Sequence, residues 1–494
     1  MDNTDEKTEE QLSLTIEDIS ASVNDKTAAK DKHREQNPKQ PASSKTAPRT
    51  ADKSVFDQLK KRSIDPKNMN NAPSRENKTV NKVSSDLKPS VGINTEKKRL
   101  SDMEVMEHTA SVWQYKEIVD NGTETHSEYH EKHTETAFGE IIGARVRGKK
   151  HKHEGTNCDD YFETAITDDC LICVVCDGAG SKPLSRIGSR VSAETAAAFL
   201  KKSLSAEFKN NENVKKGLCA ELGSAEFMSS CEKLAPVVQQ SAREAFAAQQ
   251  KALDEVSDND KYLNALGRKP ALNDFSTTFL AAVCVPLIID NKHQTLMICV
   301  QIGDGCICAV DSKANSESCL KIMGKADSGA FSGETDFLSE KNIKPEAIAA
   351  RTRISRGNSD TIMLMSDGVA DDYFPAQPMM KRLYLDLCLN GIIPMSGELS
   401  AAEDPAPIRF KSVSLSQSSV ALQYSKQLLS GDSEESVNAL WDKREALRCH
   451  SLEAFRTNIG DTPQQRLRVW LDNYNERGSF DDRTLTIIKL IMNN

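Results

Sequence analysis

The first quarter of the chain has few aromatic residues and no cysteine. Of 494 residues only 5% are Phe, Trp or Tyr, and Phe56 is the only one of these before Trp113. Residues 1–130 are instead rich in Lys, Asp, Glu, Ser, Thr and Asn, so they cannot bury enough apolar surface to offset chain entropy. We therefore expect a disordered polar tail over residues 1–130. Within it, residues 54–63 could form a short docking helix, although a transient turn is favoured because short isolated helices are marginal in water.

Long apolar runs are also missing. The N-terminus, MDNTDEKTEEQ, is acidic and is followed by no apolar segment, and no stretch reaches the length of a membrane span. The formal net charge of -9 and the pI of about 5.7 argue against a nucleic-acid partner, despite the basic patch RVRGKKHKH at residues 145–153. These features predict a soluble cytoplasmic protein without membrane or nucleic-acid partners.

Several catalytic signatures are absent. The chain has no Walker P-loop, no HExxH, no GxSxG and no Cys-x5-Arg loop, so no protein nucleophile is indicated. The 13 cysteines suggest no disulfide framework, but Cys170, Cys173 and Cys176 form a CxxCxxC pattern that could indicate zinc or an iron-sulfur cluster. Their spacers are Leu-Ile and Val-Val, which predicts a buried strand whose residues three apart face opposite sides. Core packing is the preferred interpretation, as it is for Cys306 and Cys308.

From about residue 137 short apolar runs alternate with Gly, Asn and Asp. Turns at residues 290–293 and 303–305 are expected to join neighbouring strands as hairpins. Helical periodicity is seen at 187–204, 220–252, 435–455 and 463–477. This pattern predicts an α+β fold, an antiparallel β-sandwich flanked by helices, over residues 137–494, with a helical insertion at about 376–477. The expected strands are 140–146, 160–167, 171–176, 277–285, 294–302, 306–310, 360–366 and 483–491.

Four aspartates stand where apolar runs begin or end. Asp177, Asp304, Asp367 and Asp481 lie in the segments LICVVCDGAGS, LMICVQIGDG, TIMLMSDG and SFDDRTLTIIKL. A single Asp-Gly pair after a strand is first of all a turn signal. Four carboxylates gathered at strand ends repel one another unless a cation compensates them. The set therefore predicts a site for hard divalent cations.

These segments resemble the PPM (2C) family of metal-dependent protein phosphatases, in its compact bacterial form. HKHEGTNCDDYF resembles the family's opening motif, and VVCDGAGSKPLSRIGSRVSAETAAAFL resembles the next one. STTFLAAV, QIGDG, GETDFLS, LMSDGVADDYF and DDRTLTII then follow in family order. The resemblance covers roughly residues 137–375 and 478–492, and the ordered series is more specific than any single motif.

The resemblance implies a function and a set of ligands. Asp177 would bridge two metal ions, the Gly178 carbonyl would bind one of them, and Asp367 and Asp481 would complete the first site. Asp304 would help to hold a weaker third ion. Mn²⁺ or Mg²⁺ would be the cofactor, since both prefer oxygen ligands. The implied reaction is hydrolysis of phosphoserine and phosphothreonine on proteins by a metal-bridging hydroxide.

The acid of the opening motif has two possible positions. Counting from His151 and Gly155 selects Asp160, and Asp159 then stands where the family has Gln or Glu. A second register aligns residues 157–159 with an Asn-Gln-Asp triplet and selects Asp159 instead. The sequence leaves both open, with Asp160 preferred.

The binding of the substrate phosphate departs from the family pattern. Larger members carry an Arg shortly before the opening acid, where this chain has Gly155. His151 is the best single substitute and joins Asp177 and Asp160 in the expected catalytic group. Ala179 stands where some relatives have a His that could protonate the leaving group, so modest activity is expected. The basic residues available nearby are Arg145, Arg147, Lys149, Lys150, His151 and Lys152.

Two other functions compete with this interpretation. A catalytically weak or inactive phosphatase-like module could bind a protein partner, such as a kinase, through its tail and insertion. Another two-metal phosphoesterase, such as a nuclease, shares the ion chemistry, but the acidic charge and the lack of interleaved aromatic and basic residues disfavour it.

Overall fold

The computed structural model describes residues 13–15, 113–324, 335–393, 433–442, 462–473 and 480–491, all within the unit formed by residues 1–27 and 100–494. The predicted tail lies outside these ranges except for the strand β1 (Ser13–Thr15) and residues 113–130. The docking helix considered at residues 54–63 also lies outside the described residues.

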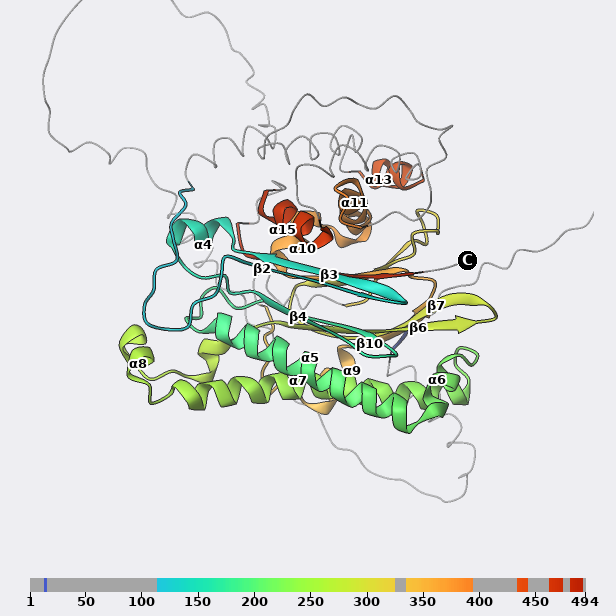
Figure 1. The fold of residues 1–494 in the computed structure, drawn as a ribbon, viewed down its shortest axis with the longest axis horizontal. Helices are drawn as coiled ribbons and strands as arrows, with labels where there is room; N and C mark the ends of the chain where they lie inside the picture. Colours follow the sequence, from blue (N-terminus) through green and yellow to red (C-terminus); the bar gives the residue numbers. More distant parts are fainter. Residues whose placement is uncertain are drawn as a thin grey trace, which may run out of the picture. The chain divides into compact units, whose positions relative to one another are not determined.

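The described residues form two stacked antiparallel sheets with helices on both outer faces (Figure 1). This arrangement confirms the predicted α+β sandwich. Sheet A has the order β1, β10 (Thr352–Gly357), β7 (Lys292–Ile302), β6 (Phe279–Ile289), β5 (Leu171–Cys176) and β4 (Tyr161–Ile166). Sheet B has the order β2 (Tyr129–Thr136), β3 (Gly139–Val146), β12 (Arg483–Leu490), β11 (Thr361–Met365), β8 (Cys306–Val310) and β9 (Leu320–Ile322).

All eight expected strands are present, and the sequence patterns missed β1, which lies within the predicted tail, as well as β2, β9 and β10. The β2 sequence YHEKHTET has no apolar alternation, because this strand lies at the edge of sheet B and none of its residues is fully buried. In β10, TRISRG, the buried positions are Thr352, Ile354 and Arg356, so two of the three inward residues are polar. Sheet B therefore begins at residue 129, eight residues before the predicted boundary of the domain.

The two expected hairpin turns have different outcomes. Asp290 and Asn291 have φ angles of 51° and 61° and join β6 to β7, which confirms that hairpin. The prediction for residues 303–305 is wrong, because β7 belongs to sheet A and β8 to sheet B. Gly303 has a φ of 117°, which favours glycine, and a side chain on Gly305 would lie 2.4 Å from the Met365 carbonyl oxygen. This close crossing between the sheets places Asp304 at their junction.

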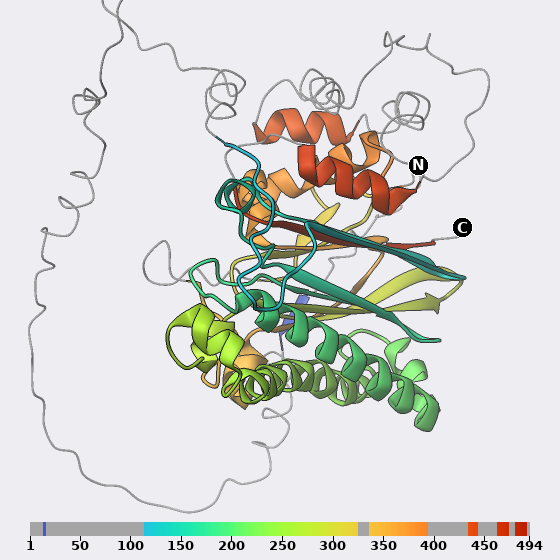
Figure 2. The ribbon, with the colours of Figure 1, turned by 60° about the vertical axis from the view of Figure 1, so that its left-hand side comes forward.

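Helices cover both outer faces, as Figures 1 and 2 show. The long helices α5 (Ser185–Asn210) and α7 (Ala225–Val256) pack on sheet A and confirm two predicted helices. In the described part of residues 376–477, α11 (Ala376–Leu389), α13 (Glu434–Trp441) and α15 (Pro463–Asn473) bury apolar side chains in one cluster with sheet B. Whether this segment also binds a partner stays a prediction.

Within the described ranges no helix combines the length and the hydrophobicity that a membrane span requires.

Short elements complete the connections. The remaining elements are α4 (Lys149–Glu154), α6 (Glu212–Leu218), α8 (Asp260–Leu266), α9 (Pro345–Ala350), α10 (Asp367–Ala370), η1 (Leu272–Phe275) and η2 (Asp371–Tyr373).

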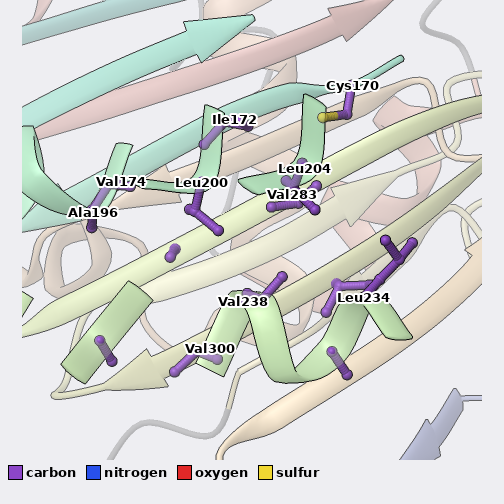
Figure 3. Packing of buried hydrophobic residues seen from close by; sticks show 14 of the residues in the cluster. Cys170, Ile172, Val174, Ala196, Leu200, Leu204, Leu234, Val238, Val283 and Val300 are labelled. Carbon is purple, nitrogen blue, oxygen red and sulfur yellow. The ribbon is translucent and has the colours of Figure 1, made fainter. Parts of the chain in front are cut away.

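Strand β5 confirms the interpretation of the cysteine pattern. Cys170 and Cys176 belong to the cluster between sheet A and its helices. Figure 3 shows Cys170 in this cluster with Leu200 and Leu204. Cys173 belongs to the cluster between the two sheets. All three thiols are free and buried, so they pack in the core on opposite faces of one strand.

Candidate metal centre and active site

Three of the predicted acids meet at one end of the sandwich. Asp177 follows β5, Asp304 lies on the crossing from β7 to β8, and Asp367 begins α10 directly after β11. One carboxylate oxygen from each of the three lies within 4.8 Å of the other two. All three residues are partly exposed, so this acidic cluster is open to solvent.

Asp481, the fourth predicted acid, lies in an adjoining group with His151 and Asp482. One ligand atom from each of these residues also lies within 4.8 Å of the others. The charge of Asp481 contributes to raising the pKa values of both Asp177 and Asp367. The two groups are therefore neighbours, and Asp481 connects them.

The backbone of Asp177 is fixed by the STTF segment that precedes β6. The Asp177 N–H donates to Thr278 Oγ1 at 2.9 Å, and the Asp177 carbonyl accepts from the Thr278 N–H at 2.8 Å and from Thr277 Oγ1 at 2.7 Å. Gly178 pairs with Thr277 in an isolated bridge. A side chain at Gly178 would lie 2.5 Å from the Asp159 carbonyl oxygen, so only glycine fits between these segments.

Burial and like charges together raise the pKa values of the acidic cluster. Burial, followed by the charges of Asp367 and Asp160, raises the pKa of Asp177 well above its ordinary value. Burial and the charges of Asp304 and Asp481 raise the pKa of Asp367 to about 7. Several oxygen donors with mutually repelling charges are the donor set that Mg²⁺ and Mn²⁺ prefer. The residues present therefore fit a divalent cation.

Asp160 and Asp159 point to different neighbours. Asp160 is 1% exposed, and its Oδ2 accepts a hydrogen bond from Thr484 Oγ1 at 2.6 Å. Its charge is among those that raise the pKa of Asp177, so it lies beside the acidic cluster. The Asp159 carboxylate lies 3.8 Å from His151 Nε2, and burial together with Asp482 raises its pKa to about 7.

Asp482 organises the second group, and the sequence patterns missed it. Its carboxylate accepts from the Gly148 N–H at 2.6 Å and from the Asp159 N–H at 2.5 Å, and it forms an ion pair with His151 Nδ1 at 2.9 Å. Burial alone would lower the pKa of His151, but Asp482 raises it to about 9. The sequence does contain a signal for this group, because two aspartates stand side by side at residues 481–482 and again at residues 159–160.

Two of the basic candidates for phosphate binding face the loop after Asp177. A side-chain carbon at Gly180 would lie 3.8 Å from Lys150 Nζ and 4.0 Å from His151 Nε2. The other candidates engage different partners. Arg145 lies over the Tyr161 ring, Arg147 pairs with Glu128 at 3.2 Å, Lys152 pairs with Asp472, and burial lowers the pKa of Lys149 to about 8.

Comparisons with known proteins relate this chain to a family. Residues 147–388 match the family model for Protein phosphatase 2C. A search of curated proteins found no match. Similar solved structures include serine/threonine phosphatase Stp1 from Staphylococcus aureus, with 11% identity over 77% of this chain and 99% of that chain and a TM-score of 0.29. They also include the PPM Ser-Thr phosphatase MsPP from Mycobacterium smegmatis in complex with cacodylate, with 11% identity, coverage of 71% and 98%, and a TM-score of 0.27. Through residues 147–388 the chain belongs to the protein phosphatase 2C family.

Proposed function

We propose that this protein is a divalent-cation-dependent phosphatase that hydrolyses phosphoserine and phosphothreonine in proteins. The observation that carries the proposal is the convergence of Asp177, Asp304 and Asp367, from three distant segments, within 4.8 Å. Such a cluster costs stability unless a cation compensates it. A purely structural module has no need of it.

The proposed ligands are the acids at the junction of the two sheets. Mn²⁺ or Mg²⁺ would occupy two sites, with a weaker third ion near Asp304. When bound, such ions supply a water acidic enough to attack phosphorus and positive charge for the phosphoryl oxygens. The ligand set is Asp160, Asp177, the Gly178 carbonyl, Asp304, Asp367 and Asp481.

Lys150 and His151 are the proposed anchors for the substrate phosphate. Both face the loop at Gly180, two residues beyond the Gly178 carbonyl. Asp482 pairs with His151 at Nδ1 and fixes the ring, which leaves Nε2 directed toward Asp159 and this loop. Positive charge in this place would hold a phosphoryl group beside the acidic cluster.

The binding-module alternative has less support. Its motivation was the tail and the insertion, but the described helices of residues 376–477 bury their apolar residues against sheet B. A kinase or another protein partner stays a prediction. No described observation favours a nuclease.

Phosphatase assays on the full chain test the proposal. The wild type is expected to hydrolyse p-nitrophenyl phosphate and a phosphothreonine peptide with Mn²⁺, and to lose this activity in EDTA. Asp367→Asn is expected to lower the rate by at least ~100-fold, the effect of losing a few kcal/mol of transition-state stabilisation. Single-stranded DNA should remain intact in the same reactions.

Asp169→Asn is the matched control, because Asp169 pairs with Lys215 at 2.8 Å at a distant surface. It should retain the activity of the wild type. Hydrolysis that persists in EDTA, or an Asp367→Asn protein as active as Asp169→Asn, would contradict the proposed site.

A further inference from the structure

An irregular segment from outside the family match packs against elements that lie beside the site. Residues 113–128, here called the strap, are described without helix or strand and precede both β2 and the start of the family match at residue 147. Their sequence, WQYKEIVDNGTETHSE, has no family motif. Their contacts nevertheless fall on the elements that build the metal site.

The first half of the strap packs alongside α4, the helix that carries His151. The Lys116 N–H donates to the Lys152 carbonyl at 2.7 Å, and the Val119 N–H donates to the Gly155 carbonyl at 2.9 Å. The Trp113 ring lies 5.4 Å from the His153 ring and 4.9 Å from the Phe480 ring. Phe480 directly precedes Asp481, so this half contacts two of the segments that supply site residues.

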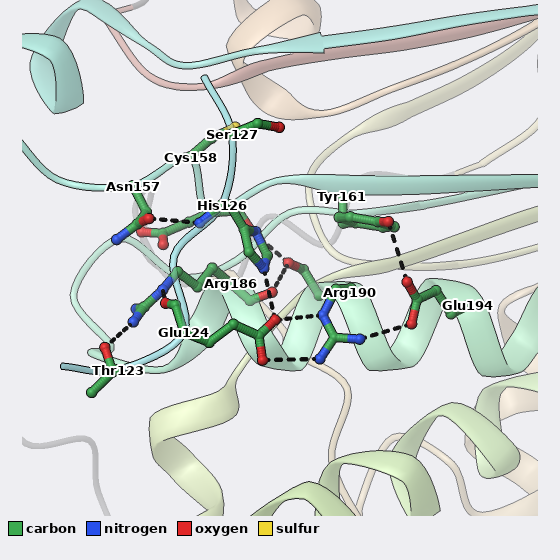
Figure 4. A network of polar contacts seen from close by, with 12 residues as sticks. Thr123, Glu124, His126, Ser127, Asn157, Cys158, Tyr161, Arg186, Arg190 and Glu194 are labelled. Atoms are coloured by element: carbon green, nitrogen blue, oxygen red, sulfur yellow. Dashed lines mark hydrogen bonds and ion pairs between the residues drawn. The ribbon is translucent and has the colours of Figure 1, made fainter. Parts of the chain in front are cut away.

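The second half of the strap is held by two arginines on α5, as Figure 4 shows. Arg190 forms a bidentate pair with Glu124, with Nε at 2.7 Å from Oε1 and Nη2 at 3.1 Å from Oε2. Arg186, one turn earlier, donates to the Glu124 carbonyl at 2.7 Å and to Thr123 Oγ1 at 2.6 Å. Arg186 is only 5% exposed. Planar guanidinium groups bound at several points fix a neighbouring segment more rigidly than a single contact does.

The same turn of α5 holds the opening-motif loop. Ser189, which lies between the two arginines, donates to the Asp159 carbonyl at 2.6 Å. On the strap side, the His126 N–H donates to Asn157 Oδ1 at 2.7 Å. Loop residues 157–160 are therefore held by the strap and α5 together, next to the tight contact between Asp159 and Gly178.

We propose that the strap is a positioning element of the metal site, and that Glu124 and Arg190 are its main positioning residues. Their pair holds α5 and the strap at a fixed separation, so that loop 157–160 keeps Asp160 beside Asp177. Neither residue touches the acidic cluster. The inference rests on the proposed function, because it assumes that the cluster binds divalent cations.

Calorimetric titration of the full chain with Mn²⁺ tests this inference. Glu124→Gln removes the charge and keeps the shape, and it is expected to raise the Kd for Mn²⁺ by roughly 10-fold, within the range known for groups that orient metal ligands. The rate on p-nitrophenyl phosphate should fall at low Mn²⁺ and recover toward that of the wild type at saturating Mn²⁺. A merely stabilising contact would leave the Kd unchanged.

Glu163→Gln is the matched control. It removes the ion pair with Lys132, and the side chains of Glu163 and Glu124 are similarly exposed, at 24% and 33%. It is expected to change thermal stability without changing the Kd. Should Glu124→Gln fail to fold, Arg190→Lys keeps the charge but loses the bidentate geometry, and a roughly 3-fold rise in Kd is expected.

The outcomes separate the two proposals. A wild type that takes up no Mn²⁺ refutes the proposed function. A wild type that binds Mn²⁺, together with Glu124→Gln and Arg190→Lys proteins of equal Kd, refutes only the role of the strap. If Glu124→Gln and Glu163→Gln weaken Mn²⁺ binding equally, the role of the strap is also refuted, because the loss of an ion pair elsewhere would then have the same effect.

Discussion

Three groups of side chains among the described residues have ligand atoms close enough for a metal ion, and the acidic cluster differs from the group on the β2–β3 hairpin in how its charges are compensated. In the acidic cluster, Asp177, Asp304 and Asp367 come from three segments far apart in the sequence. In the hairpin group, His133 and Glu135 lie on β2 and Glu140 lies on β3, and their ligand atoms are also within 4.8 Å. Proximity alone therefore does not distinguish them.

The hairpin group has a local explanation. Glu135 and Glu140 are direct cross-strand partners, and like charges in that position destabilise a hairpin. His133 Nε2 lies 2.7 Å from Glu140 and 3.7 Å from Glu135, so its ring contacts Glu140 within hydrogen-bond distance and stands between the two carboxylates. The charges acting most strongly on Asp177 are all negative. Uncompensated charge, rather than the number of ligand atoms, indicates where a cation is required.

The largest expected effect comes from Asp177→Asn. Because Asp177 stands among like charges, its loss should weaken Mn²⁺ binding by more than ~100-fold and abolish phosphatase activity. In EDTA the same change should raise the free energy of unfolding by on the order of 1 kcal/mol, since one repelling charge is gone. Calorimetric titration with Mn²⁺ and urea denaturation measure the two effects.

Asp177→Asn should therefore abolish the activity and, at the same time, make the metal-free protein more stable. An Asp177→Asn protein that unfolds more easily than the wild type in EDTA would show that the carboxylate is compensated within the protein. The distinction between the two groups would then fail.

The acids could be singled out from the sequence because each one stands near a strand boundary, beside a glycine or a second acid. Strand ends such as those before Asp177 and Asp367 are local properties, visible from apolar runs and glycine. Their convergence needed only the correct fold class. The strands that were missed, β2 and β10, lack apolar alternation, so no local pattern could reveal them.

The partners of the acids could not be predicted in the same way. Asp482 is recognisable only from its contacts with Gly148 and Asp159, more than 300 positions earlier in the chain. The crossing at Gly303 also depends on tertiary structure, because the same short turn could have closed a hairpin. Glu124 and Arg190 pair across 66 positions and carry no motif.

Glu124 is a third case, a carboxylate that is compensated by the guanidinium of Arg190. The hydrogen bond with His126 and the Arg190 guanidinium hold its pKa at about 2, against an ordinary value of 4.5. Because this pKa is lowered in the folded state, the stabilisation is present above pH 4.5 and is lost as the pH falls toward 2.

The prediction concerns the difference in unfolding free energy between the wild type and Glu124→Gln. In EDTA it should be about 1 kcal/mol at neutral pH, since the pair is partly exposed and screened by solvent, and it should shrink on acidification. Urea denaturation at several pH values between neutral and acidic measures it. A difference that stays constant or grows as the pH falls would show that the charge of Glu124 is not what stabilises the strap.

The smallest effect is expected in the hairpin group, with His133→Gln. Glutamine can still donate to Glu140, so the free energy of unfolding should change by less than ~0.5 kcal/mol. The Kd for Mn²⁺ should stay within about 2-fold of the wild type, and the number of bound ions should not change. Calorimetric titration of both proteins decides this, because a lost ion in His133→Gln would mean that a compensated group also binds metal. Charge balance would then no longer separate the hairpin from the acidic cluster.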